Sequence, residues 1–194
     1  MQDGWQKLTW LLFKYRIRLT FLIFILLLGY ESWHGLSPRR PFDPSDPLGL
    51  LGGIMALAGA LIRTWSAGVI HKNDRLATTG PYALCRHPLY LGSLTMALGF
   101  MILLNEPLNF LALGVLILLV YVPKIRAEEA LLSDLYPEAW TVYTRTTGLL
   151  FPKSLPTEVS IPWSRKQWTR NREHHGLLFA VLLLAILIWA AWTA

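Results

Sequence analysis

Five apolar stretches restrict this chain to a narrow range of folds. They lie at residues 17–33, 48–65, 89–104, 108–122 and 177–192. With 54% hydrophobic and only 15% charged residues among 194, the chain carries more apolar surface than a soluble domain of this size buries. Apolar stretches close to the ~20 residues needed to cross a bilayer predict transmembrane helices. We therefore expect an all-α, polytopic membrane helix bundle with about five transmembrane helices.

The middle of the chain allows two arrangements. Only Asn105, Glu106 and Pro107 separate the third and fourth stretches, which form either an up-and-down pair or a buried re-entrant hairpin. Further on, large apolar side chains recur at residues 132, 136, 140 and 143, which is the spacing of an amphipathic helix. We expect Pro137 to break that helix.

The basic residues predict the orientation. If the N-terminus is cytosolic, only Arg39 and Arg40 of the 18 lysines and arginines lie on the opposite side. We therefore interpret the basic residues as a signal of membrane orientation. We expect no nucleic-acid partner, because the charges do not gather on one soluble face. The pattern fits a bacterial inner membrane, and a eukaryotic endomembrane also fits. The single cysteine, Cys85, excludes an intrachain disulfide.

Residues 78–92 gather polar side chains immediately before an apolar stretch. Pro88 suits the first turn of a helix, which puts His87 near the N-cap, where backbone N–H groups and the helix dipole favour an anion. Arg86 adds a fixed charge, and Tyr90 lies on the same helical face as His87. The segment predicts a site for a small anionic, nucleotide-like cofactor. The alternative is a membrane-interface belt, in which such residues are common.

A second polar cluster consists of Lys124, Arg126, Glu128 and Glu129. These residues are spaced as helix-surface ion pairs, which contribute only a few tenths of a kcal/mol, roughly. Alternatively, a carboxylate of this cluster binds ribose hydroxyls, or one of its cations attracts a charged substrate. Both clusters are predicted at cytosolic helix ends, so they are able to face each other.

Other functional signals are weak. The histidines at 71, 174 and 175 have no carboxylate or cysteine at a ligand spacing, so we expect no metal. The sequence also has no phosphate-binding lysine loop and no Gly-x-Gly-x-x-Gly motif, which leaves a soluble nucleotide-binding enzyme without support.

The ordered motifs resemble one family over roughly residues 48–152. They are Gly80-Pro81-Tyr82, Arg86-His87-Pro88-Leu89-Tyr90-Leu91-Gly92, Glu128-Glu129 and the segment 136–143. The resemblance is to the isoprenylcysteine carboxyl methyltransferase and phospholipid methyltransferase family of integral membrane enzymes. It implies S-adenosyl-L-methionine as the methyl donor, bound at the cytosolic mouth of the helices.

The resemblance also implies roles for individual residues. The cofactor-binding residues would be His71, Leu76, Ala77, Thr78, Tyr82, Arg86, His87, Pro88, Leu89, Tyr90, Glu128 and Glu129. The catalytic residues would be Lys124, Arg126, Glu128 and Glu129, with Lys124 and Arg126 competing for one position.

The resemblance divides the chain in two. Residues 1–152 would form the methyltransferase core, with cofactor motifs in 71–92 and 124–143, and residues 153–194 would add an interfacial linker and an extra transmembrane helix. The acceptor would be lipophilic or membrane-associated: an isoprenylcysteine-like carboxylate, a lipid amine or a small thiol. Two alternatives remain, a sterol-reductase-like membrane reductase using NADPH and a non-enzymatic membrane protein.

Overall fold

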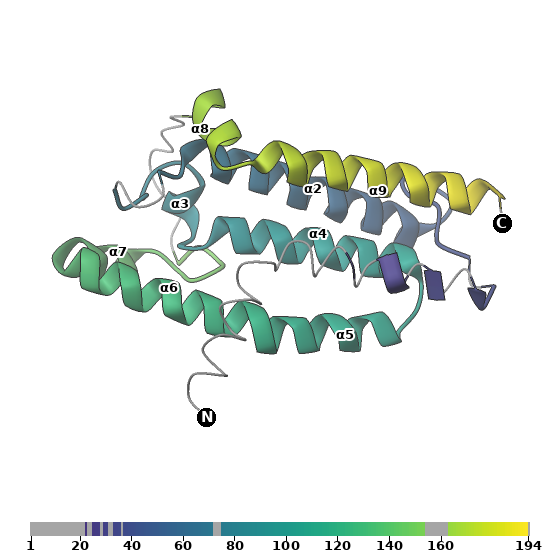
Figure 1. Cartoon of the computed structure of the whole chain (residues 1–194), viewed down its shortest axis with the longest axis horizontal. Coiled ribbons are helices and arrows are strands. Elements are labelled where there is room, and N and C mark those ends of the chain that lie inside the picture. The colour runs from purple at the N-terminus through teal and green to yellow at the C-terminus, as the bar shows by residue number, and fades with distance from the viewer. Residues whose placement is uncertain are drawn as a thin grey trace.

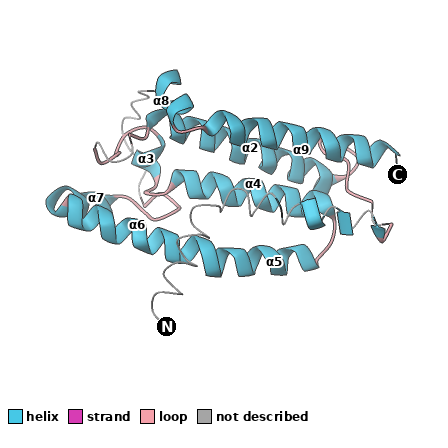
Figure 2. Ribbon diagram, viewed as in Figure 1, coloured by secondary structure: helices cyan, strands magenta, loops and turns pink. Residues whose placement is uncertain are grey.

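A computed structural model describes residues 22, 25–27, 29–30, 33–35, 37–71, 75–153 and 163–193. This part of the chain is helical and contains no β-strand, only an isolated bridge between Cys85 and Gly148 (Figure 2). The helices are α2 (Pro47–Val69), α3 (Pro81–Leu84), α4 (Pro88–Leu104), α5 (Leu108–Leu116), the π-helix η1 (Ile117–Tyr121), α6 (Val122–Leu135), α7 (Pro137–Thr146), α8 (Arg165–Arg170) and α9 (Glu173–Thr193). The fold is thus an all-α membrane helix bundle.

The long helices lie side by side along the longest axis of the molecule. In Figure 1, α4 lies between the α2–α9 pair and the continuous helix formed by α5, η1 and α6. The short helices α3, α7 and α8 gather at one end of this bundle, where α4 and α9 begin and α2 ends. Several helix ends therefore meet at the same place.

Three of the described helices are long and apolar enough to cross a membrane: Pro47–Val69, Leu108–Leu135 and Glu173–Thr193. They correspond to the second, fourth and fifth predicted stretches. The third stretch is α4, a shorter apolar helix of 17 residues. The continuous 28-residue helix after α4 favours an up-and-down pair over a re-entrant hairpin. Most of the predicted first span lies outside the described residues.

Prolines and polar caps set where the helices begin. Pro47, Pro88 and Pro137 each occupy the first turn of a helix, where a missing backbone N–H costs nothing. Asp46 caps α2 by accepting a hydrogen bond from the backbone N–H of Leu48. The predicted break at Pro137 is confirmed. Pro123, by contrast, comes two residues after the end of the wide turn η1, and the helix continues through it.

A seam of small residues joins α2 to α4, the most extensive helix contact in the described chain. Ala56 and Ala60 of α2 are buried in the core, and Gly52 lies against Leu103 and the Gly99 carbonyl of α4. Small residues let two helix backbones approach closely. The seam fixes α2 and α4 relative to each other, and both helices carry residues of the site described below.

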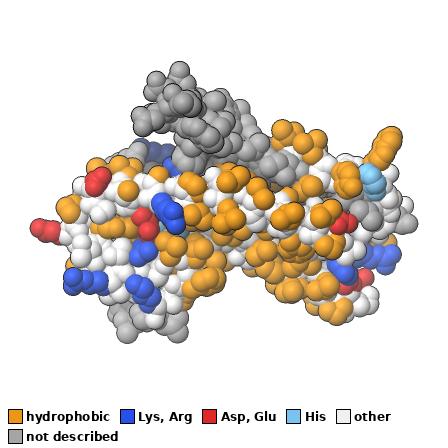
Figure 3. Space-filling view, turned by 90° about the horizontal axis from the view of Figure 1, so that it is seen from below, with side chains coloured by type: hydrophobic (Ala, Val, Ile, Leu, Met, Phe, Trp, Pro, Cys, Tyr) orange, Lys and Arg blue, Asp and Glu red, His pale blue; other side chains and the backbone are white. Residues whose placement is uncertain are grey.

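Large apolar side chains remain exposed on the outer faces of the long helices. Those on α2, α5 and α9 include Leu57, Leu61, Leu111, Val181 and Trp192. Apolar side chains cover the middle of the face in Figure 3, whereas charged side chains lie mostly toward its two ends. This distribution is the one expected of a protein whose middle contacts lipid.

Candidate active site

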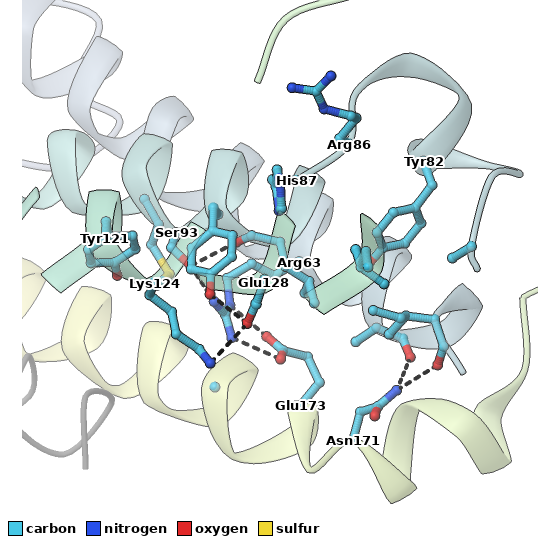
Figure 4. A pocket seen from close by; sticks show the side chains of 18 of the residues that line it. Arg63, Tyr82, Arg86, His87, Ser93, Tyr121, Lys124, Glu128, Asn171 and Glu173 are labelled. Carbon is cyan, nitrogen blue, oxygen red and sulfur yellow. Dashed lines mark hydrogen bonds and ion pairs between the residues drawn. The ribbon is translucent and has the colours of Figure 1, made fainter. Parts of the chain in front are cut away.

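A cavity of about 440 Å³ reaches from the end of the bundle where the short helices gather along most of α4. Such a volume is within the roughly 300–1,000 Å³ of sites for small molecules. Its polar lining includes Arg63, Tyr82, Arg86, His87, Tyr90, Lys124, Glu128 and Glu173 (Figure 4). These side chains come from α2, the α3–α4 segment, α6 and α9, so no single helix forms the site.

The backbone around Arg86 and His87 is fixed by the loop that follows α7. The N–H of Arg86 donates to the carbonyl of Gly148 at 2.8 Å, and that of His87 donates to the carbonyl of Leu149 at 3.1 Å. His87 is the N-cap of α4, as predicted, but its side chain forms no capping hydrogen bond. Its imidazole is therefore available to the interior of the site.

Glu129 holds the Arg86-His87 segment from the side of α6. One carboxylate oxygen, Oε1, lies 2.8 Å from Arg86 Nε and 3.2 Å from His87 Nε2. Because a carboxylate only accepts hydrogen bonds, the proton of a neutral His87 belongs on Nε2. Burial lowers the pKa of His87, although the hydrogen bond and charge of Glu129 oppose this effect. His87 is thus neutral at neutral pH, with Nδ1 as an acceptor.

Glu128, the neighbouring carboxylate, faces the cavity. Its Oε1 accepts a hydrogen bond of 2.9 Å from the hydroxyl of Tyr90 and lies 3.5 Å from Lys124 Nζ. The two glutamates therefore differ in what they contact. Glu129 anchors the Arg86-His87 segment, whereas Glu128 contributes an acceptor to the cavity beside a lysine.

Tyr82 adds a buried polar atom to the site. The left-handed Gly80, with φ of 60°, starts the turn before Tyr82, and Tyr143 donates to the Tyr82 carbonyl at 2.6 Å. The Tyr82 hydroxyl is buried without a hydrogen-bond partner among the described residues. Burial also raises its pKa well above the ordinary value, so the phenol keeps its proton. A ligand atom that accepts a hydrogen bond would satisfy this hydroxyl.

The structure brings most of the predicted site residues to one cavity. His71, Leu76, Ala77, Tyr82, Arg86, His87, Leu89, Tyr90, Lys124 and Glu128 line it. Pro88 and Glu129 are outside the lining but shape it, one by starting α4 and the other by anchoring His87. Thr78 and Arg126 have exposed side chains and do not line the cavity. Their roles in the site remain predictions.

A buried ionic cluster was not predicted. Arg63 donates to both carboxylate oxygens of Glu173, at 2.7 Å from Nε and 2.9 Å from Nη2, and its Nη1 donates to the hydroxyl of Ser93. An ionisable residue inside an apolar stretch, as Arg63 is, signals a functional site. Its partner lies 110 residues away, so the sequence does not reveal the pairing.

Two further observations concern metal binding at the site and the orientation of Arg86. Among the described residues, no group of three or more His, Cys, Asp and Glu side chains is arranged to hold a metal ion. Arg86 also lies over the ring of Trp140, 5.7 Å from its centroid, which restrains the guanidinium from a second side.

The segment that builds most of this cavity matches a known family. Residues 54–139 fit the family model described as phospholipid methyltransferase. Over these residues the chain is similar to the phospholipid methyltransferase family. The matched segment contains the motifs at 80–92 and 128–129, whereas Glu173 and the rest of α9 lie beyond it.

Two relatives resemble the chain over a longer range. A cobalt-zinc-cadmium resistance protein, CzcN, from Cupriavidus metallidurans is 36% identical over 143 residues, which cover 72% of this chain and 62% of that protein. A nickel-cobalt-cadmium resistance protein, NccN, from Alcaligenes xylosoxydans xylosoxydans is 31% identical over 141 residues, which cover 72% of this chain and 63% of that protein. The match thus spans less than two thirds of either relative. No solved structure matches the chain.

Proposed function

We propose that this chain is an integral membrane methyltransferase that transfers the methyl group of S-adenosylmethionine to a lipophilic or membrane-associated acceptor. One observation carries the proposal. The two motif segments, far apart in sequence, meet at one cavity through the Tyr90–Glu128 hydrogen bond and the contact of His87 with Glu129. The match to the phospholipid methyltransferase family model supports the same class of reaction.

The groups around the cavity fit the proposed donor. When bound, S-adenosylmethionine supplies an electrophilic methyl group on a sulfonium sulfur. Glu128 offers an acceptor for hydroxyl or ammonium groups, Lys124 and Arg86 offer cations for a carboxylate, and Tyr82 offers its hydroxyl. The neutral His87 adds no positive charge that would repel a sulfonium.

In the proposed reaction the protein orients the reactants and excludes water. The buried His87 and the apolar walls of the cavity would align the acceptor and keep the site dry. A carboxylate acceptor needs no base. For an amine or thiol acceptor, Glu128 or the Nδ1 atom of His87 would take up the proton. The positive-inside pattern supports a cytosolic site.

The names of the two relatives suggest a cellular context. Both are named as metal resistance proteins. We extend the proposal to a role in tolerance of cobalt, zinc or cadmium, through methylation of a membrane component. Growth of a deletion strain carrying wild type or Glu128→Gln at increasing metal concentrations tests this role, and equal growth of the two strains would contradict it.

Calorimetric titration of S-adenosylmethionine and S-adenosylhomocysteine into the full chain in detergent tests the activity. We expect saturable binding that His87→Ala and Glu128→Gln each weaken about tenfold or more, the loss expected for a hydrogen bond to a charged group. His34→Ala and Glu138→Gln, both exposed, are matched controls that keep wild-type affinity. NADPH binding in place of the methyl donor would favour the reductase alternative, and folded wild type that binds neither donor nor product would contradict the proposal.

A further inference from the structure

The cavity changes character along α4. Its lining on that side runs from His87 to Met101, which at 1.5 Å per residue is about 20 Å. As far as Ser93 the lining is largely polar. Beyond Ser93 it becomes apolar, with Met96, Ala97, Phe100, Met101, Ala112, Leu113, Leu116 and Phe179. A cavity with this division fits an amphiphile, whose polar group and apolar part lie end to end.

The Arg63–Glu173 ion pair lies at the boundary between these two regions. Arg63 reaches it from α2 and Glu173 from the first turn of α9, while Ser93 contributes its hydroxyl from α4 (Figure 4). The side chain of Arg63 is 16% exposed and that of Glu173 is 8% exposed. Burying two charges is costly, so a stabilising role alone explains this pair poorly.

Among the described residues, the hydrogen bonds of the cluster leave Arg63 with unused donors. The guanidinium has five N–H groups, of which two donate to Glu173 and one to Ser93. The Ser93 hydroxyl itself donates to the carbonyl of Leu89 at 2.8 Å, so its oxygen is free to accept from Arg63. Because both partners fix the plane of the guanidinium, the two remaining N–H groups have set directions at the wall of the cavity.

We propose that Arg63 binds an oxygen atom of the acceptor's polar group, and that Glu173 is the positioning residue that holds Arg63 for this contact. The ligand is an amphiphile with a carboxylate, phosphate or carbonyl oxygen next to an apolar chain that extends along α4, α5 and α9. The identification of this ligand as the methyl acceptor rests on the proposed function. The last helix, outside the family match, thereby completes the acceptor end of the site.

Binding of dansylaminoundecanoic acid, an amphiphile with a carboxylate, tests this proposal in lipid nanodiscs containing the full chain. Dodecanoate should displace the fluorescent probe, and dodecyltrimethylammonium, which has no oxygen, should not. Arg63→Lys keeps the positive charge but loses the planar guanidinium with its fixed set of N–H donors. Glu173→Gln keeps the shape of the side chain but loses the ion pair. Each should weaken probe binding about tenfold or more, the loss expected for a charged hydrogen bond. Glu138→Gln, in an exposed position, is the matched control.

A purely structural pair would behave differently. In the exchange variant Arg63→Glu with Glu173→Arg, the ion pair can re-form, so thermal stability should recover relative to the single variants whereas probe binding should not. Recovery of both, or unchanged probe binding in Arg63→Lys, would overturn the proposal. If the single variants do not fold, Ser93→Ala, which leaves the ion pair intact, should still weaken probe binding.

A parallel titration with S-adenosylhomocysteine separates this proposal from the proposed function. Product affinity should change less than about twofold in Arg63→Lys, because the contacts assigned to the donor lie elsewhere in the cavity. Wild type that binds the probe but not the product would refute the methyltransferase proposal and leave the amphiphile site standing. Wild type that binds the product but not the probe would refute the amphiphile site alone.

Discussion

Replacing Gly99 with alanine tests whether the seam between α2 and α4 supports the site. A Cβ atom at Gly99 would lie 2.6 Å from the Gly52 carbonyl oxygen and closer still to the backbone nitrogen of Ala56. Neither obstacle is a side chain that can rotate away, so the helices would have to separate. Gly114 of α5 is the matched control, because a Cβ atom there meets no described atom within 4 Å.

The two substitutions should change the free energy of unfolding in opposite directions. Alanine gains about 1 kcal/mol of helix propensity over glycine at either position. At Gly99 we expect an overpacking cost near the top of the usual range of about 1–3 kcal/mol, because backbone atoms are the obstacle. Gly99→Ala should therefore lose about 2 kcal/mol of stability, whereas Gly114→Ala should gain up to about 1 kcal/mol.

Thermal unfolding in one detergent, followed by tryptophan fluorescence, measures the difference between these variants. The nine tryptophans provide the signal. S-adenosylhomocysteine affinity should fall with stability in Gly99→Ala only, because the seam fixes the position of α4, whose N-terminal end carries His87 and Tyr90. Equal midpoints for the two variants would refute the argument that backbone contact at Gly99 sets the helix separation.

Two further predictions concern titratable groups near the start of α4. Burial raises the pKa of Cys85 to about 11, so at about pH 8 only one thiol in roughly a thousand is ionised. We expect Ellman's reagent to modify Cys85 only after unfolding, and rapid modification of the native protein would contradict its burial. Burial lowers the pKa of His87 below its unfolded value of about 6.5, so the unfolded chain binds more protons between the two values. The stability contributed by neutral His87 is therefore complete above about pH 6.5 and is lost as the pH falls through the lowered pKa. Unfolding midpoints at decreasing pH should fall more steeply for wild type than for His87→Gln, and parallel profiles would argue against a buried neutral imidazole.

The sequence predicted the features of the fold that depend on local pattern. Hydropathy located α2 and α9, and proline chemistry located the start of α4 and the break before α7. The small-residue face of α2 is likewise a local pattern, because Gly52, Ala56 and Ala60 recur every four positions. Each of these signals is contained within one helix, which is why a single sequence was enough to detect it.

The features that the sequence did not reveal depend on contacts between distant segments. The pairing of Arg63 with Glu173 arises only when α2 and α9 pack together. The loop carbonyls of Gly148 and Leu149, which hold the Arg86-His87 backbone, have no side-chain signature. The adjacent glutamates were noticed, but their different contacts follow from the orientation of α6 in the bundle.

The continuous helix from Leu108 to Leu135 has a consequence for how ligands reach the cavity. The glycine seam locks α2 against α4, whereas α5 meets the rest of the described chain mainly through a small contact with α4. Sparsely packed elements are the ones that open first. Opening of the cavity would thus begin beside α5, whereas the hydrogen bond of Glu128 with Tyr90 and the contacts of Glu129 with Arg86 and His87 hold α6 against the start of α4.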